Sequence, residues 1–176
     1  MNLISLRPLE EIDPEVLEEL RRRLAETFTC PVEIKPQTVD LACAYKLSRN
    51  QYHSTTFLST VTMPEKGGKP LGIADVDLYV PELNFAFGEA DRSLGVAIIS
   101  LFRLSPERYD LPPNRESFIE RAAKEASHEL GHAYGLGHCH EAQCIMYFSN
   151  SLMETDREEA PFYTECHQFL ENQSIC

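Results

Sequence analysis

Residues 127–138 read SHELGHAYGLGH, and their pattern is typical of a helix that carries a metal site. Residues four apart on an α-helix share one face and lie about 6 Å apart along the axis, so His128 and His132 direct their imidazoles toward one point. Glu129 is offset from both and is poorly placed to bind the same ion. Its carboxylate therefore stays free to accept a proton from water at the metal, which is the position of a general base.

His138 adds a third imidazole, but a straight helix would carry it away from the other two. The chain must turn sharply after His132, and this requires a residue that tolerates a positive φ, for which Gly135 and Gly137 are the candidates. Three neutral imidazoles leave a zinc ion its double charge and a fourth position for water, whose pKa such a site brings to about 7. A bare H-E-x-x-H pattern occurs by accident on many helices, whereas the added Gly and His are rare by chance. The spacing predicts zinc-assisted hydrolysis.

The residues that follow His138 narrow the family. Residues 137–169 read GHCHEAQCIMYFSNSLMETDREEAPFYTECHQF. The run resembles the archaemetzincin family of zinc metallopeptidases, whose pattern is H-E-x-x-H-x-x-G-x-x-H-C-x4-C-x-M with a C-x-x-C about seventeen residues further on. Residues 71–91, LGIADVDLYVPELNFAFGEAD, are similar to that family's segment before the active-site helix. The resemblance covers about half of the chain.

The resemblance implies the roles of the histidine motif. It implies that His128, His132 and His138 bind a catalytic zinc and that Glu129 is the general base in the hydrolysis of a peptide bond. Met146 would form a Met-turn, whose thioether lies beneath the three histidines. A thioether suits such a floor, because it packs closely and competes only weakly as a ligand. The implied substrate is a peptide or an unfolded protein.

The same resemblance implies a second, structural zinc held by Cys139, Cys144 and Cys166. Here the sequence departs from the family pattern, because Phe169 stands where the second cysteine of C-x-x-C belongs. A closed structural site needs four ligands of the Cys or His type. Free or disulfide-linked thiols are the alternative for these cysteines. The candidates for a fourth ligand are His167, His140, the terminal Cys176 and water.

Two further alternatives stay open in the sequence. Tyr147, next to Met146, is a candidate donor to the oxyanion, although a tyrosine beside a buried turn more often serves packing. The substituted cysteine also leaves room for a second function, a zinc-binding protein that recognises peptides and cuts them weakly or not at all. The presence of Glu129 argues against this second function, since a pure binder has no need of a base.

Composition favours a single compact domain that does not bind nucleic acid. The chain has 176 residues, of which 43% are hydrophobic and 25% charged, and this suffices for one real core. We expect one catalytic domain (1–176), with a sheet and the active-site helix in an N-terminal subdomain (1–138) and the Met-turn and cysteines in a C-terminal subdomain (139–176). The net charge of −12 provides no basic stripe to neutralise phosphates.

The sequence also bears on the compartment. No apolar run approaches the roughly 20 residues that are needed to span a membrane. The chain starts MNLISLRPLEEIDPE, and its apolar stretch is too short for a secretory signal. We therefore expect a cytoplasmic monomer, not bound to membrane, whose cysteines bind metal or stay reduced.

Strands alternate with helices along the chain, which predicts an α/β fold. We expect a metzincin-like twisted sheet of about five strands, mostly parallel with one antiparallel edge strand, packed by the active-site helix and followed by a small zinc-stapled C-terminal subdomain. Strands are expected at residues 2–7, 30–37, 71–80, 84–88 and 95–101, and helices at 14–28, about 49–61 and about 115–134.

The segment 84–88 is expected to be the edge strand beside the active-site helix. An extended peptide can pair with the backbone of such an edge, and this would stretch the scissile bond across the zinc. The active-site helix has a narrow face of mostly small residues, which lets it pack closely on the sheet. These residues are Ile119, Ala122, Ala123, Ala126, Leu130 and Ala133.

Overall fold

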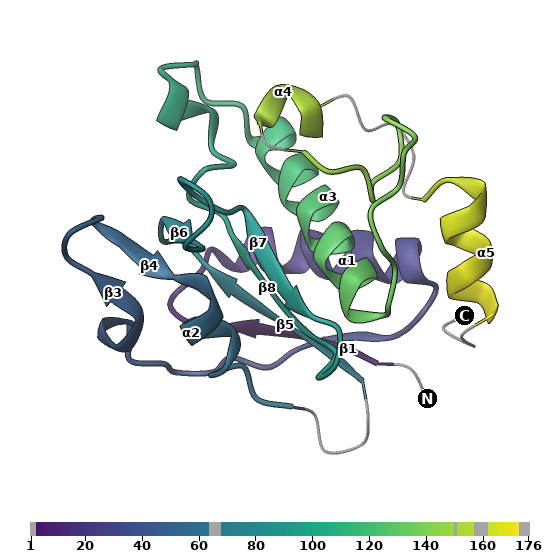
Figure 1. Ribbon diagram of the computed structural model, residues 1–176, viewed down its shortest axis with the longest axis horizontal. Coiled ribbons are helices and arrows are strands. Elements are labelled where there is room, and N and C mark those ends of the chain that lie inside the picture. The colour runs from purple at the N-terminus through teal and green to yellow at the C-terminus, as the bar shows by residue number, and fades with distance from the viewer. Residues whose placement is uncertain (1–2, 64–67, 150, 157–161, 173–176) are drawn as a thin grey trace.

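The centre of the protein is a five-stranded sheet, seen in a computed structural model that describes residues 3–63, 68–149, 151–156 and 162–172. Its strands are β1 (Ile4–Pro8), β2 (Val32–Ile34), β5 (Lys69–Ala74), β7 (Gly88–Asp91) and β8 (Val96–Ser100). They lie in the order β2-β1-β5-β8-β7 (Figure 1). Four strands run parallel, and β7 is an antiparallel edge strand paired with β8. This confirms the predicted α/β class with its mostly parallel sheet.

The central strands are buried on both faces. All five residues of β8 are buried, and β5 is buried from Pro70 to Ala74. In the register of the two strands, Ile73 lies opposite Ile99. Branched side chains suit such a strand, and burial on both faces is usual where a parallel sheet is covered by helices on each side. The outer β2 is shorter than the predicted strand at 30–37, and residue 2 of the first predicted strand lies outside the described residues.

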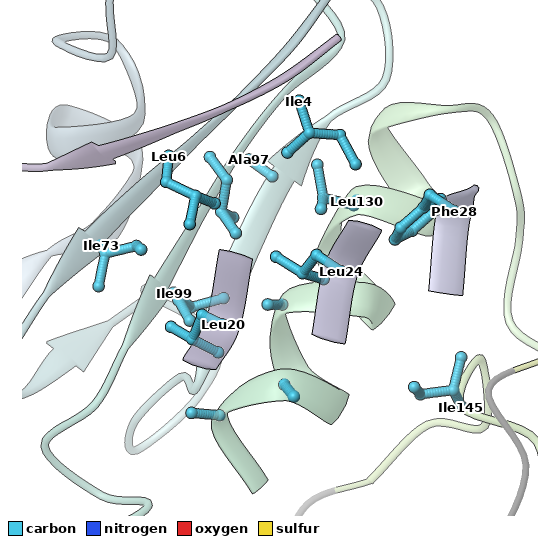
Figure 2. Packing of buried hydrophobic residues seen from close by; sticks show 14 of the residues in the cluster. Ile4, Leu6, Leu20, Leu24, Phe28, Ile73, Ala97, Ile99, Leu130 and Ile145 are labelled. Carbon is cyan, nitrogen blue, oxygen red and sulfur yellow. The ribbon is translucent and has the colours of Figure 1, made fainter. Parts of the chain in front are cut away.

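Helices α1 (Pro14–Phe28) and α3 (Arg115–Ala133) cover one face of the sheet (Figure 1). The carboxylate of Asp13 accepts a hydrogen bond of 2.9 Å from the backbone N–H of Glu15, and a proline in the first turn completes this helix start. Leu20 and Leu24 of α1 then point into the core beside Leu130 of α3 (Figure 2). Each such buried leucine contributes about 1.5–3 kcal/mol. The predicted small-residue face of α3 is buried throughout.

The other face of the sheet carries α2 (Ser54–Leu58) and a small second sheet. This sheet has the order β3-β4-β6, from β3 (Tyr45–Lys46), β4 (Gln51–His53) and β6 (Leu78–Tyr79). Phe57 of α2 is fully buried in a cluster with Ile98. The predicted helix at 49–61 is wrong in its first part, because residues there pair as β4 with the distant β6.

The predicted strand at 71–80 is wrong as a single element. The chain leaves the main sheet after β5 and enters the second sheet as β6. Two side chains hold the crossing: Ser100 donates a hydrogen bond of 2.6 Å from Oγ to the carbonyl of Val76, and Arg103 binds both carboxylate oxygens of Asp77 at 2.6 and 2.7 Å. The partial alternation of apolar residues continues from β5 into β6, so the sequence pattern gives no sign that the strand is interrupted.

The predicted strand at 84–88 is also wrong, since β7 begins only at Gly88. The carbonyl of Asn84 accepts hydrogen bonds from Gln51 Nε2 at 2.9 Å and from Arg49 Nη2 at 3.1 Å. These long-range side-chain donors hold the segment before β7 as an ordered loop. The turn after β7 therefore starts at residue 92, and not at residue 89 as predicted.

The C-terminal part contains two helices that the sequence patterns did not predict, α4 (Leu152–Thr155) and α5 (Thr164–Asn172). Arg121 of α3 binds both carboxylate oxygens of Asp156 at 2.8 Å, which ties the end of α4 to the active-site helix. Two 3₁₀ helices, Leu41–Ala44 and Pro106–Tyr109, complete the elements. Among the described residues no helix combines the length and apolar character needed to cross a membrane.

Candidate metal centres

Three imidazoles converge at the end of α3, and we call His128, His132 and His138 the imidazole cluster. The Nε2 atom of His132 lies 3.0 Å from that of His128 and 3.2 Å from that of His138. Nitrogen ligands that share one tetrahedral zinc ion are spaced by roughly 3.3 Å, given zinc–nitrogen bonds of about 2.0–2.1 Å. The spacing therefore fits one zinc ion with its fourth position free for another ligand.

The second ring nitrogens of two histidines are fixed by backbone carbonyls. The Nδ1 atom of His128 donates to the carbonyl of Ile145 at 2.6 Å, and that of His132 donates to the carbonyl of Leu136 at 2.9 Å. This sets the tautomer that leaves Nε2 free for a metal. Burial lowers the pKa of His128 to about 3 and also lowers the pKa of His132. Both rings are thus held neutral, which is the form that binds metal.

The turn that brings His138 back to the cluster is made at Gly135. This residue has a φ of 107°, which an L side chain rarely adopts, and its carbonyl accepts a hydrogen bond from the guanidinium of Arg92. Gly137, the other candidate, has no neighbour within 4 Å of an added Cβ. The structure therefore assigns the turn to Gly135 and leaves Gly137 without a steric role.

Met146 packs against α3 at Gly131, one residue before His132. Its side chain is fully buried, and its sulfur lies so close to the backbone of Gly131 that a Cβ added there would overlap Sδ. A glycine inside a helix ordinarily costs about 0.5–1 kcal/mol relative to alanine. Here the missing Cβ is what lets the helix settle on Met146, and this role of Gly131 escaped the sequence reasoning.

Glu129 is buried beside the cluster, against the edge strand. A Cβ added at Gly88 of β7 would lie 2.6 Å from Glu129 Cγ and 2.9 Å from its Oε1, so the glycine makes room for the carboxylate. Burial raises the pKa of Glu129 well above its usual range, and the nearby carboxylates of Glu125 and Glu89 raise it further. Sequence reasoning missed Glu125, although this residue stands one helical turn before Glu129 and could have been noticed.

A cleft of about 390 Å³ opens in front of the imidazole cluster. Phe148 stands at its rim, with a ring centroid 5.0 Å from that of His138. Tyr147, the candidate donor to an oxyanion, is not among the described residues that line this cleft. The cleft is lined by residues 83–88, Glu125, Glu129, Phe148, Ser149 and the imidazole cluster.

The structure also brings together Cys139, Cys144 and Cys166, which we call the thiol cluster. Their sulfur atoms all lie within 4.8 Å of one another, and those of Cys144 and Cys166 are 3.8 Å apart. The sulfur of Cys144 accepts backbone N–H groups from Met146 at 3.4 Å and from Tyr163 at 3.3 Å. Such donors stabilise a thiolate, as a metal ligand requires.

Without a cation the thiol cluster is a poor place for negative charge. Burial and the neighbouring Cys144 raise the pKa of Cys166 to about 12, and burial raises the pKa of Cys144 as well. A divalent ion reverses this effect, because it attracts the thiolates that otherwise repel one another. Three close sulfurs with N–H donors therefore fit a zinc ion, whereas free thiols gain nothing from the arrangement.

Comparison with known proteins identifies the family of the chain. The model of peptidase family M54 matches residues 45–172. The chain is also 39% identical to the archaemetzincin of Methanocaldococcus jannaschii, over 98% of this chain and 94% of that one. The chain belongs to the archaemetzincin family. The archaemetzincin of Pyrococcus furiosus is equally similar, at 39% identity over 98% of this chain and 94% of its own length.

Solved structures show the same archaemetzincin fold. The archaemetzincin of Archaeoglobus fulgidus, crystallised with malonate, has a TM-score of 0.81 at 35% identity and covers 95% of this chain and 99% of its own. A zinc-dependent peptidase from Methanocorpusculum labreanum reaches a TM-score of 0.85 at 29% identity, with the same coverage. The predicted family is thereby confirmed, and membership in it supports a zinc metallopeptidase.

Proposed function

We propose that this archaemetzincin hydrolyses peptide bonds, with a catalytic zinc on the imidazole cluster and Glu129 as the general base. The observation that carries the proposal is the convergence of three Nε2 atoms beside a buried carboxylate at the head of a cleft. Three imidazoles without a fourth protein ligand are the usual arrangement of a catalytic zinc site, whereas structural sites are closed by four.

Zinc held by the three imidazoles would activate water and polarise the scissile carbonyl. The protein's own part is that of Glu129, whose carboxylate would take a proton from the attacking water and return it to the leaving amine. Its raised pKa suits this double role, because a group that both takes and returns a proton works best when its pKa lies near the working pH. Gly88 contributes by letting the carboxylate lie close over β7.

The walls of the cleft favour a peptide as the substrate. Residues 83–88, Phe148 and Ser149 line the cleft together with the imidazole cluster. The segment before β7 is held by Arg49 and Gln51, and the edge strand β7 that follows can offer its backbone to an extended chain. The cleft is built from a single chain, so we infer that a monomer suffices for activity.

We further propose that a second, structural zinc on the thiol cluster holds the C-terminal subdomain (139–176) against the N-terminal one (1–138). This subdomain contributes few buried apolar residues of its own, among them Ile145, Met146 and Leu170. A metal crosslink between the loop after α3 and α5 compensates for such a small core.

Peptide hydrolysis in matched glutamate variants tests the proposed function. In a diverse peptide library, Glu129→Gln should reduce kcat/KM by about 10²–10⁴-fold, the usual contribution of general acid–base catalysis, while its zinc content stays that of the wild type. Glu120→Gln makes the same change on the exposed side of α3, where Glu120 pairs with Lys124, and should leave the rate unchanged.

Two results would count against the proposed function. One is equal hydrolysis by the wild type and Glu129→Gln. The other is no hydrolysis by the zinc-loaded wild type, and in that case peptide binding without cleavage would identify a zinc-binding peptide-recognition protein instead.

A further inference from the structure

The thiol cluster has only three ligands because Phe169 takes the place of a fourth cysteine. Phe169 lies one turn after Cys166 on α5, so the two side chains share a helix face. A cysteine at this position would reach the cluster. The phenylalanine ring instead packs toward the turn after α3, where its Cζ would lie 3.6 Å from a Cβ added at Gly135. The substitution has thus exchanged a ligand for a packing contact.

No other described side chain is placed to replace that ligand. His167 follows Cys166 directly and points away along the helix surface, with Nδ1 3.4 Å from Glu171 Oε1 and both side chains 56% exposed. Among the described residues, the three cysteines alone form the group of sulfur, nitrogen and carboxylate ligands within 4.8 Å of one another at this place. Cys176 lies outside the described residues, and its role is decided by the test below.

His140 lies next to the thiol cluster but outside it. It lines the same groove as Cys139 and Cys166, and its side chain is exposed to solvent. Its ring nitrogens are not part of the group of ligand atoms that all lie within 4.8 Å of one another. His140 therefore does not complete the cluster in this structure, and its replacement is included in the test below.

The cluster borders a groove of about 360 Å³. Cys139 and Cys166 line this groove together with Phe169, while Cys144 stays buried behind them. A metal on the three sulfurs therefore has one side toward solvent. This differs from a closed structural site, where four protein ligands surround the ion.

We propose that the thiol cluster is a three-thiolate metal site whose fourth position faces this groove and takes an exchangeable neutral ligand. Water fills it at rest, and a nitrogen donor of the imidazole type can replace water. This inference rests on the structural zinc proposed above and goes beyond it, because it makes the second site a place that binds a ligand.

Charge selects a neutral ligand over an anion. Three thiolates and one divalent zinc ion carry a net charge of minus one, and Glu141 and Glu165 line the same groove. An anionic ligand from solution, such as a free thiolate, would be repelled by the net charge of the site and by these two carboxylates. An imidazole adds no charge and is a good ligand for zinc.

Cobalt(II) in place of zinc makes the fourth ligand visible. Among the described residues the thiol cluster is the one metal-binding group that contains thiolates, so a thiolate-to-cobalt charge-transfer band reports the second site even when cobalt also fills the imidazole cluster. Titration of the cobalt-loaded full chain with imidazole should shift the band and saturate. In Phe169→Cys the band should be about 1.3-fold stronger, as four thiolates replace three, and should no longer respond to imidazole.

Two further variants exclude ligands from the chain itself. His140→Ala and Cys176→Ser should keep the wild-type band and its response to imidazole. A wild-type band that imidazole does not change, or a band altered by either variant, would overturn the proposed open position. Absence of any charge-transfer band would mean that the cluster binds no metal, and peptide hydrolysis tests the catalytic site separately, so the failures are distinguishable. The wild-type titration decides the question even if Phe169→Cys does not fold.

Discussion

The loop of residues 139–147 contacts the imidazole cluster and supplies two cysteines of the thiol cluster, yet the two clusters are built in different ways. Two of the histidines stand on the rigid helix α3, whereas the cysteines come from the loop and from the separate helix α5. The loop is closed by a hydrogen bond of 2.8 Å from the N–H of Cys139 to the carbonyl of Met146. Helix geometry thus positions two members of the first cluster in advance, whereas the second cluster depends on the packing of α5 against the loop.

The shared loop also couples the clusters. The carbonyl of Ile145, which accepts the Nδ1 proton of His128, directly follows Cys144 of the thiol cluster. A metal on the thiols would therefore fix the carbonyl that orients His128 of the imidazole cluster. We infer that the thiol cluster supports the imidazole cluster through this one carbonyl.

Metal removal should give the largest difference between the two regions, measured as protection of their amide hydrogens from exchange. Structural zinc binding in small zinc-dependent domains contributes about 10–16 kcal/mol at pH 7, and α5 has little other support. We expect amide hydrogens of α5 to lose protection from exchange after chelation, while those of β5 and β8 remain protected by the buried sheet. Hydrogen exchange with mass spectrometry measures this. The variant His132→Ala, which lacks only the imidazole cluster, should keep α5 protected; unchanged α5 in the metal-free wild type would contradict the account.

Loss of one thiol should weaken zinc at the catalytic site. Changes that disturb the partners of a metal-bound histidine typically cost about 10–100-fold in metal affinity. Cys144→Ser frees the loop that carries the carbonyl of Ile145, so the zinc affinity of the imidazole cluster should fall by about this factor in competition with a chelator. Cys43→Ser is the matched control, because Cys43 is exposed and outside both clusters. Equal affinities in the two variants would show that the clusters are independent.

The contact between Gly131 and Met146 should give the smallest effect, a change in the free energy of unfolding. Replacing Gly131 by alanine gains up to about 1 kcal/mol of helix propensity but overpacks the buried Met146, which typically costs about 1–3 kcal/mol. We expect a net loss of about 1 kcal/mol in the free energy of unfolding. Gly137→Ala, with open space around its added Cβ, should stay within about 0.5 kcal/mol of the wild type. Denaturant unfolding compares them, and a Gly131→Ala protein as stable as Gly137→Ala would remove the steric argument.

The imidazole cluster could be predicted because its information is local. Helix spacing alone brings His128 and His132 together, and the need for a positive φ limits the turn to two glycines. Helix geometry alone leaves both glycines open, whereas the family pattern H-E-x-x-H-x-x-G-x-x-H has its glycine at Gly135, and in the structure Arg92 of the β7–β8 turn binds the carbonyl of this residue. The thiol cluster was predicted only through a family pattern, and its geometry depends on α5, a helix too short to show a clear apolar period.

The fold predictions failed where distant side chains decide the path of the backbone. Runs of apolar residues in the sequence predict the five-stranded sheet, and the structure confirms this part of the prediction. The strand predicted at 84–88 is mostly a loop, and Arg49 and Gln51, more than thirty residues away, both bind the carbonyl of Asn84 there. The close approach of Glu129 to Gly88 also could not be predicted from the sequence, because it depends on how β7 and α3 pack together.

Native mass spectrometry of the zinc-loaded chain tests the central claim, that two separate clusters each bind one zinc ion. The account predicts two zinc ions per chain in the wild type and one in each of the variants His132→Ala and Cys144→Ser. A wild type with a single zinc ion, or a Cys144→Ser protein that still carries two, would contradict it.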